Sequence, residues 1–261
     1  MNIIQAIILG IVQGLTEFLP ISSSGHIELG KALLGIEARK DLTFTVVVHG
    51  GTVLSTIVVF RKDIFEIFED LRERQWNEST QYLAKIFISM IPVVIIGLLF
   101  QEEIESFFFG NIFLVGNMLL VTGGMLIFTY FSRDHDQEIT FKNAFIVGLA
   151  QAFALLPGIS RSGSTIATAL LLRVKKDVAT KFSFLMVLIP IIGANLKDIL
   201  FGNLTNEGIG FFPLLVGFLA AFFAGLLACS WMVNIVKKGK LIYFAIYCFI
   251  VGMTAIYVSL Q

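Results

Sequence analysis

Long apolar runs constrain this chain more than any other feature of its sequence. Runs of about 20 residues recur, among them Phe44–Phe60 and Phe211–Val236, and a helix needs that length to cross a hydrocarbon core of roughly 30 Å. Of all residues, 56% are hydrophobic and 15% charged, whereas about a quarter of a soluble domain is charged. The alternating short segments of a membrane barrel do not occur. We therefore expect an all-α polytopic membrane protein.

Six segments are predicted to be full transmembrane helices: about 42–60, 86–100, 110–131, 182–200, 211–236 and 241–259. Two other apolar regions, about 3–36 and 141–173, are interrupted at their centres by "LPISSSGH" and "LPGISRSGS". Irregular backbone at membrane depth must be buried in protein or line a wet cavity. We therefore expect two re-entrant helical hairpins, with additional full crossings as the alternative.

The two interrupted regions resemble each other at an offset of 138 residues. This offset aligns Gln13 with Gln151, Ile21 with Ile159, Ser22 with Ser160, Ser24 with Ser162, Gly25 with Gly163, and Phe44 with Phe182. An internal duplication is the simplest interpretation. We therefore expect one membrane domain, 1–261, made of a first repeat at about 1–137 and a second at about 138–261.

Lysine and arginine are unevenly distributed among the connections. Segments 61–85, 132–143, 173–181 and 237–240 hold 14 of these residues, whereas 27–41, 101–109 and 197–210 hold 4. The rich segments all fall on one side if both hairpins leave by the face they enter, and cytoplasmic loops carry such an excess. The repeats would then have inverted topology, with both termini outside. In such architectures the binding site lies between the repeats.

Glu17 and Arg161 are the most conspicuous charges inside the apolar regions. A charge at the centre of a membrane helix costs roughly 2.5–3.5 kcal/mol on insertion scales, so both are functional candidates. Gln13 shares a helix face with Glu17, and the pair could bind a metal, with Glu17 alternatively acting as a base. One carboxylate holds a divalent cation poorly unless phosphate oxygens complete its shell. A structural ion pair between the repeats is the other interpretation.

The first motif adds hydroxyl groups and an imidazole to this carboxylate. Ser22, Ser23, Ser24, Gly25 and His26 follow Pro20 directly. A serine near a histidine and a carboxylate has the groups needed for nucleophilic catalysis or for positioning water. Packing of small residues is the alternative explanation for the serines.

The second motif, "PGISRSGSTI", has the composition of an anion site. Gly158 and Gly163 would let a ligand approach the backbone, and the helix opening near Ser164 would present N–H groups. Arg161 adds a fork that fits phosphate oxygens. The polar candidates around it are Ser160, Ser162, Ser164 and Thr165.

The remaining polar residues carry weaker predictions. We expect Cys229 and Cys248 to be small buried hydrophobes, His49 to pack against a hairpin, and His135 to be solvated. The N-terminus lacks a basic region and a cleavage site, so we expect it to be part of the mature protein. Zero net charge argues against a nucleic-acid partner. Five lysines are expected to set topology and to contact anionic membrane lipids: Lys175, Lys176, Lys237, Lys238 and Lys240.

Taken together, "QGLTEFLPISSSGH" and "LPGISRSGSTI" resemble the two signature segments of the bacterial undecaprenyl-diphosphate phosphatase family, also called bacitracin-resistance proteins. The resemblance covers essentially the whole chain and includes "FSFLMVLIP" after the second segment. It implies hydrolysis of undecaprenyl diphosphate to the monophosphate and inorganic phosphate, which recycles the lipid carrier of cell-wall synthesis. The implied setting is the bacterial inner membrane, with Mg²⁺ or Ca²⁺ as cofactor and a site open to the periplasm.

The resemblance also assigns roles. Its functional positions fall on Glu17, Ser23, His26 and Arg161, and its metal-binding acidic motif on Gln13 and Glu17, where other members carry two carboxylates. The expected substrate-binding positions are Ser22, Ser24, Gly25, Gly158, Ser160, Ser162, Gly163, Ser164 and Thr165. The resemblance leaves room for a homodimer. A polyprenyl-phosphate flippase or transporter is the alternative function, because fold does not fix function.

Overall fold

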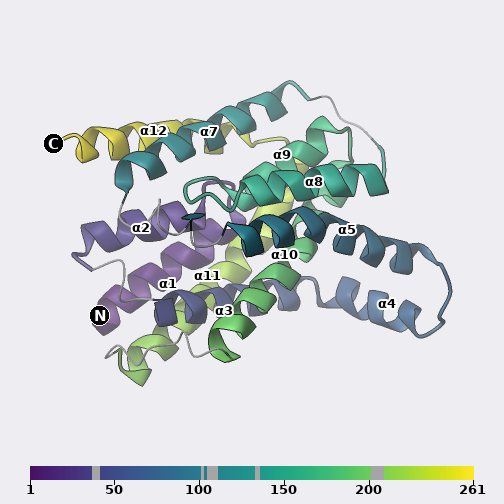
Figure 1. Ribbon diagram of the computed structural model, residues 1–261, viewed down its shortest axis with the longest axis horizontal. Coiled ribbons are helices and arrows are strands. Elements are labelled where there is room, and N and C mark those ends of the chain that lie inside the picture. Colours follow the sequence, from purple (N-terminus) through teal and green to yellow (C-terminus); the bar gives the residue numbers. More distant parts are fainter. Residues whose placement is uncertain (37–41, 101–102, 105–110, 133–135, 201–208) are drawn as a thin grey trace.

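The computed structural model describes the chain except residues 37–41, 101–102, 105–110, 133–135 and 201–208. His135 and most of the 101–109 connection therefore lie outside the described residues. In the described part the regular structure is helical, apart from one isolated bridge between Gln137 and Val174. The all-α prediction is confirmed. The helices are α1 Ile3–Phe18, α2 Ser23–Leu33, α3 Leu42–Val59, α4 Arg61–Leu71, α5 Glu78–Leu99, α7 Ile112–Tyr130, α8 Phe141–Phe153, α9 Arg161–Leu171, α10 Lys176–Leu200, α11 Phe211–Lys237 and α12 Ile242–Ser259 (Figure 1).

Five described helices are long and apolar enough to cross a membrane: α5, α7, α10, α11 and α12. A sixth span results if α3 and α4 are counted together, although the chain bends by 71° between them. The predicted spans coincide with α3 and these five helices. Two of them start earlier than predicted, α5 at Glu78 and α10 at Lys176, because their polar first turns precede the apolar run. Asn77 caps α5 by accepting a hydrogen bond from the Thr80 N–H.

Helix α4 was not predicted, because it lies in the segment 61–85 that we expected to be a connection. Its sequence, "RKDIFEIFEDL", carries too many charges to read as an apolar run. It is nevertheless amphipathic, with Ile64 and Ile67 packed against the main hydrophobic core. Hydropathy finds spans, and it misses helices whose apolar side is narrow.

Two helix pairs coincide with the interrupted regions. Helix α1 ends just before Pro20 and α2 follows the cap Ser22, while α8 ends before Pro157 and α9 follows the cap Ser160. In both pairs the partners pack against each other. Figure 1 shows that α1 and α2 share the left-hand end of the molecule, whereas α8 starts at the right-hand end. The irregular tips of the two pairs therefore meet near the centre.

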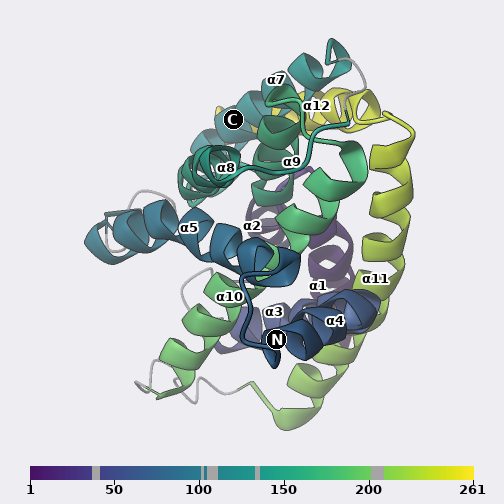
Figure 2. The same ribbon diagram turned by 90° about the vertical axis from the view of Figure 1, so that its right-hand side faces the viewer.

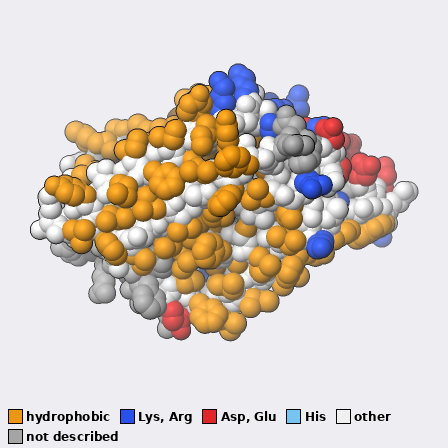
Figure 3. All heavy atoms as spheres, turned by 90° about the horizontal axis from the view of Figure 1, so that it is seen from above, with side chains coloured by type: hydrophobic (Ala, Val, Ile, Leu, Met, Phe, Trp, Pro, Cys, Tyr) orange, Lys and Arg blue, Asp and Glu red, His pale blue; other side chains and the backbone are white. Residues whose placement is uncertain are grey.

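Helix α11 supports the first pair from outside, and Figure 2 shows it running along one flank of the molecule. It approaches α1 so closely that a Cβ atom added at Gly14 would lie 2.5 Å from the Ala221 carbonyl oxygen. Two fully buried rings, Phe44 and Phe182, occupy positions 138 residues apart. Figure 3 shows apolar side chains over the left and central parts of one face, with most of the visible charged side chains toward the right.

Candidate active site

Glu17 is the centre of the candidate site. It lies in the last turn of α1, and its side chain is 8% exposed. Its Oε2 atom accepts hydrogen bonds from Gln13 Nε2 at 3.0 Å and from Ser23 Oγ at 2.6 Å. Its Oε1 atom lies 3.6 Å from Arg161 Nη2. The structure therefore unites Gln13, Glu17, Ser23 and Arg161, as the motifs predicted.

Ser23 and Arg161 reach Glu17 from equivalent positions, since they stand 138 residues apart and each opens a helix. The cap serines that precede them also behave alike. Ser22 Oγ accepts from the Gly25 N–H at 3.3 Å, and Ser160 Oγ accepts from the Gly163 N–H at 3.1 Å. Helix α9 thus opens at Arg161, and our expectation of an opening near Ser164 was wrong. Since the cap side chain takes the third N–H group, the first two N–H groups of α9 are its candidate anion donors.

The tips of the two pairs are in direct contact. Ser162 Oγ donates a hydrogen bond to the Leu19 carbonyl at 3.2 Å. Gly158 has φ +93°, and a Cβ added at Gly25 would lie 3.3 Å from its Cα atom. The Gly158 carbonyl accepts from Thr122 Oγ1 at 3.2 Å. Gly158 is therefore required by its backbone conformation as well as by the crowding around it.

Two of the predicted binding hydroxyls have structural partners. Thr165 Oγ1 donates to the Arg161 carbonyl at 2.9 Å and also bonds Ser183 of α10. Ser164 Oγ donates to Met125 Sδ at 3.7 Å. Thr165 thus helps to hold the turn that carries Arg161, whereas Ser164 is directed toward α7. Ser22 and Ser24 also contact each other, at 3.3 Å between their Oγ atoms.

His26 does not join Glu17 and Ser23 in this structure. Its Nδ1 atom lies 2.8 Å from the Ser22 carbonyl oxygen and its Nε2 atom 2.9 Å from the hydroxyl of Tyr247. The His26 and Tyr247 rings are stacked, with centroids 5.6 Å apart. The predicted grouping of His26 with the carboxylate is therefore not seen. Catalytic contacts often tighten only when substrate binds, so this placement alone does not remove His26 as a candidate.

His49 is the histidine that lies beside Glu17, with 3.9 Å between Nε2 and Oε2. Its Nδ1 atom contacts the Thr45 carbonyl at 2.8 Å. We expected His49 to pack against a hairpin, and it does so at the site itself. The signal that sequence reasoning missed is a polar stripe at helical spacing through an apolar helix. Its members are Thr45, His49, Thr52 and Thr56.

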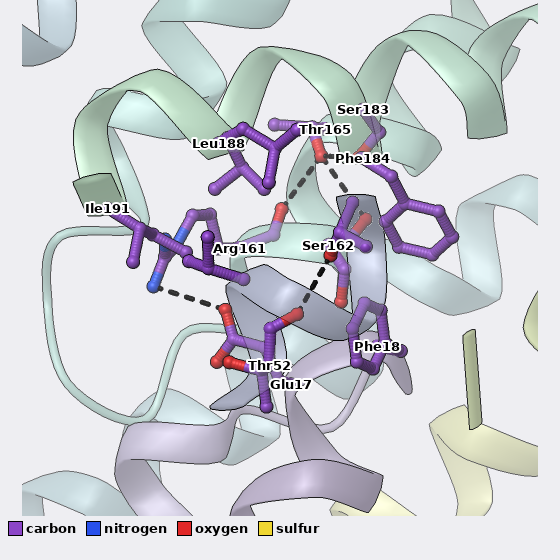
Figure 4. Close-up of a pocket in the computed structure, with 13 residues that line it drawn as sticks. Glu17, Phe18, Thr52, Arg161, Ser162, Thr165, Ser183, Phe184, Leu188 and Ile191 are labelled. Carbon is purple, nitrogen blue, oxygen red and sulfur yellow. Dashed lines mark hydrogen bonds and ion pairs between the residues drawn. The ribbon is translucent and has the colours of Figure 1, made fainter. Parts of the chain in front are cut away.

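Two cavities adjoin these residues. A small one of about 20 Å³ is lined by Glu17, Arg161 and the hydroxyls of α3, α9 and α10, enough room for one water. Figure 4 shows the Glu17 and Arg161 side chains pointing toward each other there. The large cavity, about 650 Å³, has Ser24 and His49 on its wall and is otherwise mainly apolar. That volume falls in the usual range for small-ligand sites.

A divalent cation finds part of a ligand set here. In the described part of the chain, no three His, Cys, Asp or Glu side chains gather as a metal site would require. Glu17 offers its carboxylate, and Gln13 Oε1 is a buried acceptor without a partner among the described residues. Mg²⁺ and Ca²⁺ prefer such oxygen ligands. The residues therefore fit a hard cation that a bound diphosphate also ligates.

The fold and site define a helical membrane protein in which the tips of two broken helix pairs bring a serine, a carboxylate and an arginine together. A family model described as Bacitracin resistance protein BacA matches residues 6–254, and the chain belongs to this family. A protein of Christiangramia forsetii named undecaprenyl-diphosphatase is 55% identical over 258 residues, or 98% of each chain. Proteins of the same name from Bacteroides fragilis and Methanobrevibacter smithii are 53% and 38% identical, over at least 96% of each chain.

Proposed function

We propose that the protein is a membrane phosphatase that hydrolyses undecaprenyl diphosphate to undecaprenyl phosphate and inorganic phosphate. The names and identities of its relatives support this activity. The observation that carries it is the hydrogen bond of 2.6 Å from Ser23 Oγ to Glu17, whose other oxygen faces Arg161. A hydroxyl, a base and a phosphate-binding cation within one contact of each other suit phosphoryl transfer.

In the proposed reaction, Arg161 and the first N–H groups of α9 hold the terminal phosphate. Glu17 takes the proton as Ser23 Oγ, or a water that it holds, attacks the terminal phosphorus in line. The P–O bond to the lipid phosphate breaks and undecaprenyl phosphate leaves. If Ser23 attacks, water then releases inorganic phosphate from the serine. Because this chemistry depends mostly on positioning and charge neutralisation, Arg161 should contribute strongly.

The two histidines enter this proposal differently. His26 is the proton carrier that the family resemblance suggests, and its ring would have to leave Tyr247 to reach the phosphate. His49 already contacts Glu17 and borders the large cavity. We propose that His49 orients the Glu17 carboxylate and contacts the diphosphate. A replacement such as His49→Leu should then change kcat and KM without unfolding the protein.

Mg²⁺ or Ca²⁺ is the proposed cofactor, held by Glu17, Gln13 and substrate oxygens. When bound, it would neutralise charge on the diphosphate. Gln13 adds a neutral ligand where a carboxylate would add charge, so we expect substrate to supply most of the negative charge around the cation.

The large cavity is the proposed seat of the first part of the prenyl tail. Its apolar wall comes from α5 and α10, and Gly193 of α10 lies on it. A Cβ added at Gly193 meets nothing within 4 Å, so a larger side chain would enter the cavity without displacing protein atoms. This glycine offers a way to fill the proposed tail site from inside.

We also propose the membrane arrangement that the sequence predicted. The α1–α2 and α8–α9 pairs would be re-entrant hairpins of inverted repeats, entering from opposite faces of the bacterial inner membrane. The two pairs start at opposite ends of the molecule (Figure 1), which supports this arrangement. The lysine-rich connections would then lie in the cytoplasm and the site would open toward the periplasm.

The deciding experiment measures phosphate release from undecaprenyl diphosphate by purified protein with Mg²⁺ or Ca²⁺. Arg161→Ala, Glu17→Gln and Ser23→Ala should each lower kcat by about 100-fold or more, the usual loss when a group that acts in the transition state is removed. Absence of release by the wild type would refute the enzyme and leave lipid transport. Near-normal activity of Arg161→Ala would refute the anion site.

A second arm tests the tail site. Gly193→Phe should raise KM for undecaprenyl diphosphate by an order of magnitude or more, because its ring occupies the cavity. Gly124→Phe is the matched control, since a Cβ there also meets nothing within 4 Å and Gly124 does not line the cavity. Equal kinetics for the two variants would place the tail elsewhere.

A further inference from the structure

Helix α4 is the one element whose surface the proposed reaction leaves without a role. It follows α3 after the 71° bend, and Figure 1 shows it at the right-hand end of the molecule, beside the start of α5. All its residues are described, and none of them is buried. A helix of this kind, joined at an angle to a membrane span, can lie along the membrane surface.

The residues of α4 divide into three sides. Ile64 and Ile67 pack against the main core. Phe65 and Phe68 form a second side and are 67% and 65% exposed. Arg61 precedes them by four residues and Arg72 follows by four, so the four side chains form one stripe at helical spacing. The acidic residues occupy the remaining side: Glu66, Glu69, Asp70 and Glu73.

The position of α4 is fixed by the protein itself. Asp63 forms an ion pair with Lys181 of α10. The ring of Phe60, at the bend, lies 6.0 Å from that of Phe184 in the same helix. These contacts hold the stripe outward, and only one guanidinium nitrogen of Arg61 is used inside the protein, in a hydrogen bond of 2.8 Å to the Val58 carbonyl. The other N–H groups of Arg61 can bind an external acceptor.

We propose that the Arg61–Phe65–Phe68–Arg72 stripe binds anionic phospholipids at the membrane surface. The two rings suit the boundary between headgroups and acyl chains, where aromatic side chains of interfacial helices insert. The two guanidinium groups at their ends suit lipid phosphates, which arginine binds in a bidentate manner. The acidic side of the helix then faces water. The charge pattern, with cations beside the rings and anions away from them, selects an anionic lipid surface over a second protein.

The binding can be measured by fluorescence in nanodiscs. Phe68→Trp, in a protein that also carries Trp76→Phe and Trp231→Phe, places a single tryptophan on the stripe. Discs of phosphatidylcholine and phosphatidylglycerol are prepared at one fixed ratio, with bromine on the acyl chains of either lipid in turn. We expect stronger quenching by brominated phosphatidylglycerol, because that lipid gathers at the stripe.

Charge variants show whether the arginines cause this enrichment. Arg72→Gln should lower it by roughly five-fold, the contribution of one basic residue near an anionic surface, and raised salt should weaken it as well. Lys62→Gln is the matched control, because it removes the same charge from the side of α4 opposite the stripe and should preserve the enrichment. Circular dichroism and thermal unfolding in detergent check that each variant folds.

Three results would overturn the proposal. Equal quenching by the two brominated lipids would mean that the stripe does not select anionic headgroups. No quenching by either would place the stripe in water. Quenching that depends on the number of protein copies in each disc would assign the stripe to contact between chains. None of these results bears on phosphate release, so the proposed function is tested separately.

Discussion

At the scale of single residues, Glu17 has more partners than any other side chain of the site. Its carboxylate faces two hydrogen-bond donors, a guanidinium and an imidazole, all within 3.9 Å. An ionised carboxylate in an apolar helix is tolerated when it is paired in this way. The pairing also makes the site sensitive to small changes in the charge of its neighbours.

Gln13→Glu tests whether a cation belongs beside Glu17. Two buried carboxylates 3 Å apart repel each other strongly, so the variant should unfold at lower temperature than the wild type in a chelator. Added Mg²⁺ or Ca²⁺ should raise its Tm more than that of the wild type, because a second carboxylate strengthens cation binding. The measurement is thermal unfolding with and without the metal. An identical metal response in both proteins would contradict the proposed ligand position.

Gln151 stands where Gln13 stands in the other repeat, yet it has no carboxylate beside it. Its side-chain amide is buried, and neither amide atom has a hydrogen-bond partner within the described chain. Unpaired buried polar atoms cost about 1–3 kcal/mol, so Gln151→Met, of similar size, should raise the free energy of unfolding by an amount in that range. Gln13→Met is the comparison, since it breaks the bond to Glu17. A drop in stability for Gln151→Met would mean that the amide has a ligand such as a buried water.

Residue-level prediction from the sequence succeeded where rarity was the signal. Glu17 and Arg161 were found because charges are rare inside apolar runs, and Ser23 because it follows a helix break. His49 was not assigned to the site, because its partners come from another helix pair and no local pattern shows that contact. The ring direction of His26 depends on Tyr247, which lies 221 residues away, and sequence spacing does not contain that information.

At the scale of the elements, the helix breaks were predictable and the tilts were not. Pro20 and Pro157 mark the breaks, and the serines after them supply the caps. The bend between α3 and α4 has no proline or glycine at Phe60, and it follows from packing of that ring against α10. The amphipathic pattern of α4 was visible in the sequence, but its charge concealed it from a search for spans.

The contact between α1 and α11 gives a prediction at this scale. Gly14→Val should destabilise the protein by about 3 kcal/mol, the upper end of the usual cost of overpacking, because its side chain meets the backbone of Ala221. Activity should fall as well, since Gln13 and Glu17 move with α1. Gly124→Val, at a position where a Cβ meets nothing within 4 Å, should retain wild-type stability. Tm in detergent and phosphate release measure both effects, and equal Tm values for the two variants would contradict the close packing.

At the scale of the whole molecule, the proposed topology predicts which positions share a side of the membrane. Leu33→Cys and Gln261→Cys should react with an impermeant maleimide from outside the cell, whereas Lys142→Cys and Lys175→Cys should react only after permeabilisation. All four positions except Lys175 are classed as exposed, and its side chain is 47% exposed. The native Cys229 and Cys248 are buried and should contribute little background. Labelling of Lys142→Cys and Lys175→Cys from opposite sides would show that the α8–α9 pair crosses the membrane.

The equivalence of Ser23 and Arg161 has a consequence for the history of the chain. Their positions are the same in the two repeats, yet one carries a candidate nucleophile and the other a phosphate-binding cation. A single repeat paired with its own copy would present two serines or two arginines at this point, never one of each. The present site therefore depends on divergence after the duplication. That divergence binds the halves into one gene, because neither half can now be lost or replaced by a copy of the other.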